Sequence, residues 1–155
     1  MAAPALISEL PKGYEFPATG LQITAEDILA YVDAVQDANS VYQDCGLAPP
    51  LAVAARALGQ LLQMLELPPG TLHTGQQFES ADGVPVGASL TLSGRIAQRS
   101  KRAGLIITVI EFEVTIAPAS AGTAPASAEK MPALAGKTPA LICKTTVMTP
   151  AGAPP

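Results

Sequence analysis

The residues best placed to do chemistry lie in the stretch DANSVYQD, residues 37–44, where the first helical pattern of the chain ends. Asp37 puts a carboxylate at a helix C-terminus and Asp33 one turn earlier repels it, each effect costing about a few tenths of a kcal/mol. A carboxylate kept at that cost suggests a working site, and a solvated helix end is the plain alternative. Tyr42 can donate a hydrogen bond, and Asn39 can contact a substrate or form a turn. The stretch therefore indicates a candidate acid–base site whose base has to be identified.

The identity of the base decides whether this site can work. A general base is most effective with a pKa near the operating pH, which imidazole has at about 6.5 and phenol, at about 10, has not. His73 is the only histidine of the chain and lies in a different segment, LHTGQQFES. A structural role or a place at a dimer edge is the simpler interpretation of His73. Tyr42 is then a poor base, either a partly buried ring with a satisfied hydroxyl or a hydrogen-bond donor in a site.

Length and composition limit the classes of protein to consider. A chain of 155 residues is the size of one domain. Hydrophobic residues make up 48% but aromatic residues only 4%, which predicts an aliphatic core. The net charge of -4 makes nucleic acid an improbable partner, because phosphate binding needs a basic surface. The basic cluster of residues 95–102 is interpreted as a solvated hairpin, with docking of coenzyme A phosphates as the alternative.

Cysteine usage and hydropathy give expectations about cofactors and compartment. Cys45 and Cys143 are the two cysteines and are interpreted as small buried hydrophobes; nothing resembles a thiolate metal site. We expect no metal and no cofactor. The N-terminal segment lacks a basic leader, and no segment reaches the roughly 18 apolar residues of a membrane span. We therefore expect a cytoplasmic protein with no membrane partner.

Two helices are predicted in the first half. The segment LQITAEDILAYVDAVQD has Thr24 as N-cap with Asp27 three positions on, the arrangement of a capping box. Its apolar residues recur at the spacing of one buried helix face: Ile28, Tyr31, Val32 and Val35. The second helix runs between Pro50, which suits a first turn, and the stop signal of residues 68–70. It is apolar nearly all round, so we expect burial on nearly every side.

The second half changes to the period of β-strands. Four runs rich in β-branched residues alternate apolar and polar positions: LHTGQQFES, ASLTLSGRIAQRS, GLIITVIEFEVTI and ALICKTTVM. SKRAG predicts a hairpin, and residues 21–24 predict a short strand before the first helix. The low-complexity segment at about 117–139 is predicted to be a mobile surface insertion. We expect an N-terminal extension over residues 1–18, one domain over 19–148 and a flexible tail over 149–155.

One curved antiparallel sheet wrapped around the apolar helix satisfies this inventory, because that helix needs apolar surface around it. This is the hot-dog fold, in the α+β class. Its open sheet edges can be hidden by pairing with a second copy, so we expect a dimer.

The segment of residues 23–50 resembles the MaoC-like hydratases and dehydratases, including the N-terminal type found in mycolic-acid dehydratase subunits. Those proteins carry a D-x-N-P-x-H motif followed by an APP-type turn. Here Asp37, Asn39 and Tyr42 stand in the Asp, Asn and His positions, Ser40 replaces the Pro, and residues 48–50 read APP. The family's H-x-x-Q-x-F strand, leading to a Pro and a Gly turn, is similar to this chain at a set of positions further on: His73, Gln76, Phe78, Pro85 and Gly87. The resemblance covers roughly residues 19–148.

The resemblance implies chemistry on an acyl thioester, by water addition across a 2-enoyl group or its reverse. In the family the motif Asp and His hold a water, the His is general base and acid, and a backbone N–H at the start of the hot-dog helix polarises the carbonyl. Asp37 and Tyr42 would take the catalytic positions, and Asn39, Pro50 and Leu51 would contact substrate. Because proline has no N–H, the amide of Leu51 is the candidate donor.

The leading hypothesis is a MaoC-like protein that binds an acyl-CoA or acyl-carrier thioester but is impaired or inactive alone. It would act as a subunit with a second hot-dog chain carrying the intact pair, in a homodimer or a heterodimer. An active enoyl-CoA hydratase or 3-hydroxyacyl dehydratase, using Asp37 with Tyr42 as donor, is the alternative. A hot-dog acyl-CoA thioesterase is disfavoured, because residues 51–65 contain no Asp or Glu to activate water.

Overall fold

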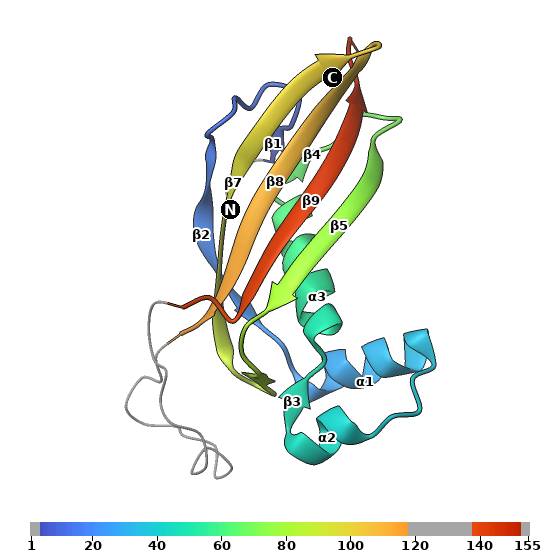
Figure 1. Cartoon of the computed structure of the whole chain (residues 1–155), viewed down its shortest axis with the longest axis vertical. Helices are drawn as coiled ribbons and strands as arrows, with labels where there is room; N and C mark the ends of the chain where they lie inside the picture. Colours follow the sequence, from blue (N-terminus) through green and yellow to red (C-terminus); the bar gives the residue numbers. More distant parts are fainter. Residues whose placement is uncertain (1–3, 118–137, 153–155) are drawn as a thin grey trace.

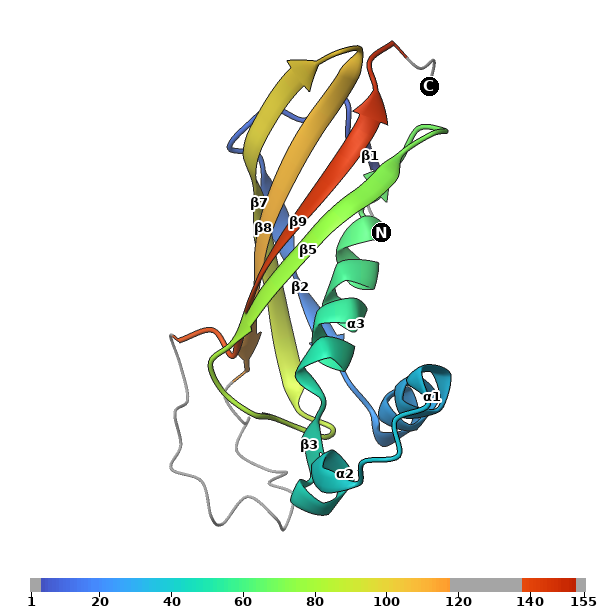
Figure 2. The same cartoon turned by 45° about the vertical axis from the view of Figure 1, so that its right-hand side comes forward.

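The computed structural model describes residues 4–117 and 138–152, and its largest element is a five-stranded antiparallel sheet (Figure 1). The strand order across the sheet is β2 (Glu15–Gln22), β7 (Ser89–Arg102), β8 (Leu105–Ile116), β9 (Leu141–Pro150) and β5 (Leu72–Ser80). Helix α3 (Pro50–Leu62) lies along one face of this sheet, as the turned view in Figure 2 shows. One sheet curved about one helix confirms the predicted hot-dog fold of the α+β class.

Helix α1 (Ala25–Val35) begins at the predicted cap. The Thr24 hydroxyl accepts from the Asp27 amide at 3.1 Å, and the Asp27 carboxylate accepts from the Thr24 amide at 2.9 Å. The Thr24 hydroxyl also donates to the Asp27 carboxylate at 2.8 Å, and these two donors, the Thr24 amide and the Thr24 hydroxyl, lower the pKa of the Asp27 carboxyl. Ile28 is buried as predicted, but Val35 is 50% exposed. The prediction for Val35 is wrong because the helix ends there, at Gln36 in the left-handed conformation.

Helix α3 buries one face only. The buried side chains are Ala52, Val53, Ala54, Ala57 and Leu61. Leu51 is 48% exposed, so the prediction of burial on nearly every side is wrong: within this chain the sheet covers a single side of the helix. The helix also ends at Leu62, well before residues 68–70, because β4 (Leu65–Glu66) pairs in parallel with β1 (Ala5–Leu6).

The N-terminal residues belong to the packed domain. Strand β2 begins at Glu15 and pairs with β7, whereas the sequence predicted a strand only over residues 21–24. Ile7, within the segment expected to be an extension, is fully buried. The guanidinium of Arg99 donates to the carbonyls of Ile7, Ser8 and Leu10 and so fastens this segment to β7. The interpretation of residues 95–102 as a solvated hairpin is therefore wrong for Arg99.

The hairpin between β7 and β8 is tighter than SKRAG suggested. Its turn is the pair Ala103 and Gly104, both with positive φ, and the strands continue up to them. Two-residue turns of this kind match the twist of antiparallel strands. Strand β3 (Leu47–Ala48) pairs with β6 (Val84–Pro85) just before α3 starts. Most of the predicted insertion, residues 118–137, lies outside the described residues.

Gly94 gives a test of the sheet packing. It lies between Phe16 and Phe112 in register, and a Cβ at Gly94 would come 2.9 Å from the Phe112 Cβ and 3.0 Å from the Glu111 carbonyl oxygen. We expect Gly94→Ala to lower the free energy of unfolding by about 1–3 kcal/mol through overpacking. Gly20→Ala, in β2 with no atom within 4 Å, should be neutral or slightly stabilising. Urea unfolding at one protein concentration measures both; equal effects would contradict this packing.

Candidate functional site

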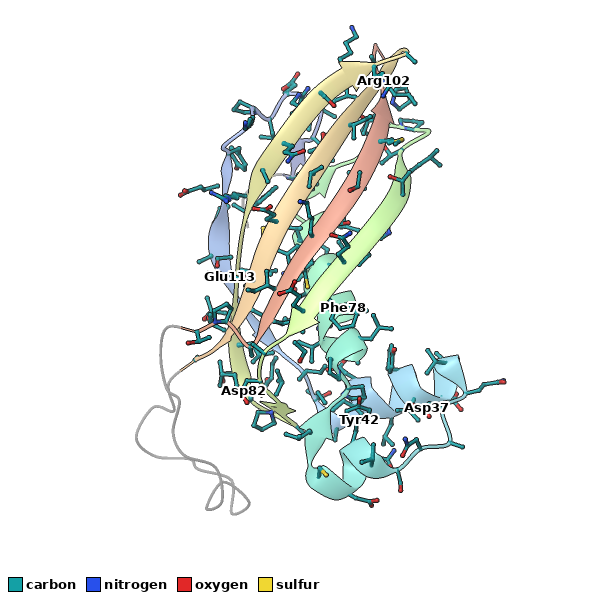
Figure 3. The ribbon with its side chains drawn as sticks, in the orientation of Figure 1. Asp37, Tyr42, Phe78, Asp82, Arg102 and Glu113 are labelled. Carbon is teal, nitrogen blue, oxygen red and sulfur yellow. The ribbon has the colours of Figure 1, made fainter. Side chains whose placement is uncertain are left out.

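The candidate site comprises the connection after α1, then α2 (Val41–Cys45), and the first turn of α3, which follow one another along the chain with only β3 between α2 and α3. Figure 3 shows Asp37 on the connection after α1, at the end of α1 that lies away from α3, and Tyr42 on α2, closer to the N-terminal end of α3. The sequence did not predict α2. The motifs nevertheless follow one another in the structure as they do in the sequence: DANSVYQD is followed by β3, and then by Pro49 and Pro50 at the start of α3. Asp37, Asn39 and Tyr42 therefore lie on consecutive segments that lead to the start of α3, and their assembly into one site stays a prediction.

Asp37 and Asn39 are engaged in local turns. The Asp37 carboxylate accepts from the Asn39 amide at 3.0 Å, and the Asp37 amide donates to the Val32 carbonyl at 3.1 Å, which closes α1. The Asn39 side-chain oxygen accepts from the Val41 amide at 3.0 Å, at the start of α2. Both side chains are exposed. These bonds give Asp37 and Asn39 structural tasks that need no substrate.

Tyr42 is half-buried and makes no side-chain hydrogen bond to another described residue. Its hydroxyl is thus available as a donor. Ser40, at the position of the family's proline, donates its hydroxyl proton to Asp44 at 2.8 Å instead. No hydrogen bond joins Asp37 to Tyr42 among the described residues, so the two do not form a preassembled pair.

The first turn of α3 offers backbone donors. Its N-cap is Pro49, which has no side-chain capping bond, and Val53 donates the first hydrogen bond of the helix, to the Pro49 carbonyl at 3.2 Å. The amides of Leu51 and Ala52 precede that bond and belong to the orphan donors of a helix N-terminus. The positive end of the helix dipole lies here as well. A carbonyl oxygen is the kind of group that this turn can polarise, with Leu51 as its first N–H.

His73 is not part of this site. It lies on the edge strand β5, in register with Val147, with its Nε2 2.8 Å from the Thr145 hydroxyl. Both residues line a cavity of about 340 Å³ at the C-terminal end of α3, together with Leu58 and Leu62. Thr145 was not predicted from the sequence as a functional residue. Its place among the inward-facing positions of β9 was a signal, because a buried hydroxyl needs a hydrogen-bond partner. The edge position of His73 agrees with its interpretation from the sequence.

A larger and more open hollow of about 830 Å³ lies over the outer face of the sheet and contains none of the predicted site residues. Its charges are mixed, and Glu111 there pairs with Arg95 at 3.1 Å and with Lys144 at 3.8 Å. Across residues 4–117 and 138–152, no group of His, Cys, Asp and Glu is arranged to hold a metal ion. The helices in those same ranges are too short or too polar to cross a membrane.

The two cysteines differ in environment, which gives a simple chemical test. Cys45 on α2 is exposed, so its interpretation as a buried hydrophobe is wrong; Cys143 is buried, and burial raises the pKa of its thiol to about 12. We expect a maleimide or iodoacetamide at neutral pH to modify Cys45 rapidly, and Cys143 only after unfolding, since the thiolate is the reactive form. Mass spectrometry with and without urea reads the sites. Rapid modification of Cys143 in the folded protein would contradict the described core.

Comparisons with known proteins agree with this geometry. The family model described as "FAS1-like, dehydratase domain region" matches residues 11–117, more than half of the chain. No curated protein matches. The (R)-hydratase from A. caviae is 15% identical, with 92% of this chain and 98% of that chain covered and a TM-score of 0.66. The C-terminally truncated HadBC complex of Mycobacterium tuberculosis, a 3R-hydroxyacyl-ACP dehydratase, is 17% identical, with 88% of this chain and 96% of that chain covered and a TM-score of 0.59.

The two kinds of comparison carry different weight. At identities of 15% and 17%, the similarity to solved structures establishes the hot-dog fold alone. The match to the family model is a match of the amino-acid sequence, so it establishes the family. That model spans α1, the segment of Asp37 and Tyr42, α3 and the strands up to β8. The chain therefore belongs to the family whose model is described as "FAS1-like, dehydratase domain region".

Proposed function

We propose that this chain is an acyl-thioester-binding subunit that is impaired or inactive alone and works with a second hot-dog chain carrying an intact Asp/His pair. The observation that supports this most is the position of the only imidazole. His73 is hydrogen-bonded to Thr145 in the cavity at the C-terminal end of α3, whereas Asp37 and Tyr42 belong to the segments that precede the N-terminal end of that helix. The family's base position therefore holds a phenol, and no histidine of the chain replaces it.

The features that would bind a thioester are retained. The first turn of α3 has the amide of Leu51 and the positive end of the dipole, both suited to a thioester carbonyl. The exposed Asp37 carboxylate and the half-buried Tyr42 phenol lie on the segments that lead into this turn. Because a positioned general base contributes typically about 10²–10⁴-fold, losing it weakens turnover without removing binding. The acyl group is carried either by coenzyme A or by a carrier protein.

A second hot-dog chain would cover the open edge of the sheet. Strand β5 is the last strand of the sheet, with Leu72 58% and Phe78 38% exposed, and Ile142 of the adjacent β9 is 46% exposed. An apolar sheet edge is a liability unless it is paired. Two similar structures, HadBC and ChsH1-ChsH2 of Mycobacterium tuberculosis, are complexes. These observations favour a partner at β5, either a copy of this chain or a different hot-dog chain.

An active hydratase or dehydratase is the second candidate function. The Tyr42 hydroxyl has no hydrogen bond to another described residue, so it is available to donate to a substrate while Asp37 handles the water. A thioesterase is less well supported, because α3 carries no carboxylate along its whole length.

Restoring the imidazole tests the proposal. The purified chain is mixed with trans-2-enoyl-CoA substrates of several chain lengths, and hydration is followed by loss of the enoyl thioester absorbance. We expect the wild type to be nearly inert and Tyr42→His to gain about 10²-fold or more, because a base of suitable pKa then stands at the family position. Adding Asp37→Asn to Tyr42→His should remove that gain.

Robust turnover by the wild type that is lost in Asp37→Asn would sink the subunit proposal and favour the active hydratase. Binding of a saturated acyl-CoA is measured in parallel by calorimetry. An absence of binding to every acyl-CoA and acyl-carrier thioester tested would remove the thioester assignment itself.

The proposed interface at β5 has its own test. Leu72→Lys puts a charge at the edge strand, and Leu29→Lys on α1 is a matched control because both leucines are 58% exposed. We expect Leu72→Lys to weaken association at least tenfold in sedimentation velocity, with the pure chain or with the hot-dog chain that co-purifies with it. Leu29→Lys should leave association unchanged. The interface lies elsewhere if both variants associate like the wild type.

A further inference from the structure

The interior of the domain is polar at one end only. Over the described residues, the buried polar or charged side chains are three threonines: Thr108, Thr145 and Thr149. All three lie on β8 and β9, toward the end of the sheet where α3 finishes (Figures 1 and 2). The opposite end of the same sheet face is apolar, with Leu90, Val114 and Leu141 almost fully buried. A polar group inside an aliphatic core needs a partner or a function.

Several of these polar groups lack partners. The hydroxyls of Thr108 and Thr149 and both polar side-chain atoms of Gln76 are buried without a hydrogen bond to any described residue. Gln76 pairs in register with Thr145, and Thr108 pairs with Val147. The unpartnered groups therefore surround one position on the sheet, at the boundary between β5 and β9.

A cavity opens next to these groups and is lined by their neighbours Thr145 and Val147, although Gln76, Thr108 and Thr149 do not line it. Its volume is about 340 Å³, and its walls come from the end of α3, the connection before β5, and strands β5 and β9. Leu58, Leu62 and Val147 make it mainly apolar, and the turn of residues 68–71 is fixed by two hydrogen bonds from Thr71 to the Pro68 carbonyl, at 3.1 and 2.6 Å. The hydroxyl of Thr71 is thereby occupied. The polar function of the cavity comes from His73 and Thr145.

The His73–Thr145 contact leaves one ring nitrogen for a ligand. Thr145 is fully buried and its hydroxyl lies 2.8 Å from Nε2 of His73 and 3.4 Å from the Gly75 carbonyl oxygen. When Thr145 donates to Nε2, Nδ1 carries the proton and is a donor; when Nε2 donates to Thr145, Nδ1 is an acceptor. A ligand hydroxyl can accept from Nδ1 in the first tautomer and donate to it in the second. A ligand carbonyl can only accept, so it fits the first tautomer alone. Thr145 is thus a positioning residue for the ring.

Apolar side chains that are not fully buried lie on one face of α3, between its first turn and this cavity. Leu51, Ala55, Leu58 and Leu62 recur at i, i+4, i+7 and i+11, which puts them on one face of α3. The first two are exposed and the last two half-buried. At 1.5 Å per residue, Leu58 and Leu62 lie about 10 and 17 Å along the axis from Leu51. An acyl group whose carbonyl accepts from the Leu51 amide would lie along this face of α3. Its chain would reach the cavity only if it is long enough to span that distance.

We propose that the cavity takes the distal end of the acyl group and that this end carries a hydroxyl, which hydrogen-bonds to Nδ1 of His73. The inference rests on the proposed function, because it places the thioester at the first turn of α3. It narrows the substrate class to oxygenated acyl thioesters of medium length. His73, which matches the histidine of the family's strand motif and not its catalytic histidine, is then a recognition group.

Calorimetry with saturated acyl-CoAs tests this, because a saturated chain is no substrate for hydration. The full chain, with any partner that co-purifies, is titrated with octanoyl- to tetradecanoyl-CoA, each with and without an ω-hydroxyl. We expect the hydroxylated ligand to bind about tenfold more tightly at the length that reaches His73. His73→Phe and Thr145→Val should abolish that preference while keeping affinity for the unmodified ligand. Thr115→Val is the matched control, since the Thr115 hydroxyl also bonds a strand carbonyl at 3.4 Å but lies outside the cavity.

Equal or weaker binding of the hydroxylated ligand at every length would overturn the inference and leave the proposed function standing. A preference that survives in both His73→Phe and Thr145→Val would overturn it as well. If neither ligand binds at any length, the thioester assignment fails and this inference fails with it.

Discussion

The burial of one face of α3 against the inner face of the sheet is the interaction on which the rest of this structure depends. Val53, Ala57 and Leu61 are fully buried in this contact, and the sheet contributes Leu92, Ile96 and Ile110 among its buried residues. Burying a large aliphatic side chain contributes about 1.5–3 kcal/mol, so this layer dominates the stability of the domain. A single sheet covers one side of a helix, however, and the opposite face of α3 and the edge of β5 are left open. The proposed partner chain would bind at the edge of β5, and the proposed acyl group would lie along the uncovered face of α3.

Much of this architecture follows from local patterns in the sequence. The alternation of Leu90 and Leu92 with polar residues predicts β7 because the strand period is a local property. Strand β2 was largely missed because EFPATGLQ contains Pro17 and Gly20, residues that argue against a strand. The structure accommodates them at the sheet edge, with a register shift between Phe16 and Thr19. That accommodation depends on pairing with β7, which a local pattern does not contain.

The sequence orders the segments of the candidate site along the chain but does not describe their local structure. The order of its motifs places Asp37 and Tyr42 near the start of α3, but a five-residue helix such as α2 is too short to show a period. The hydrogen bonds that engage Asp37 and Asn39 are local, and their residue types favour such turns. The contact between His73 and Thr145 joins residues 72 positions apart and depends on the register of β5 with β9. Such a contact follows from the assembled sheet and not from either segment alone.

The two ends of α3 therefore differ in what they can do. The N-terminal end has backbone donors and the positive end of the dipole, which suit a carbonyl oxygen, but its side chains include no imidazole. The C-terminal end has an imidazole fixed by a buried hydroxyl, but a base must lie within hydrogen-bond reach of the proton it removes. Leu58 and Leu62, which line the cavity with His73, lie about 10–17 Å along the helix axis from Leu51, so His73 is not placed to act at the first turn of α3. If a partner chain supplies the catalytic Asp/His pair, this chain needs no imidazole at the N-terminal end of α3. His73 can then bind the distal end of the acyl group.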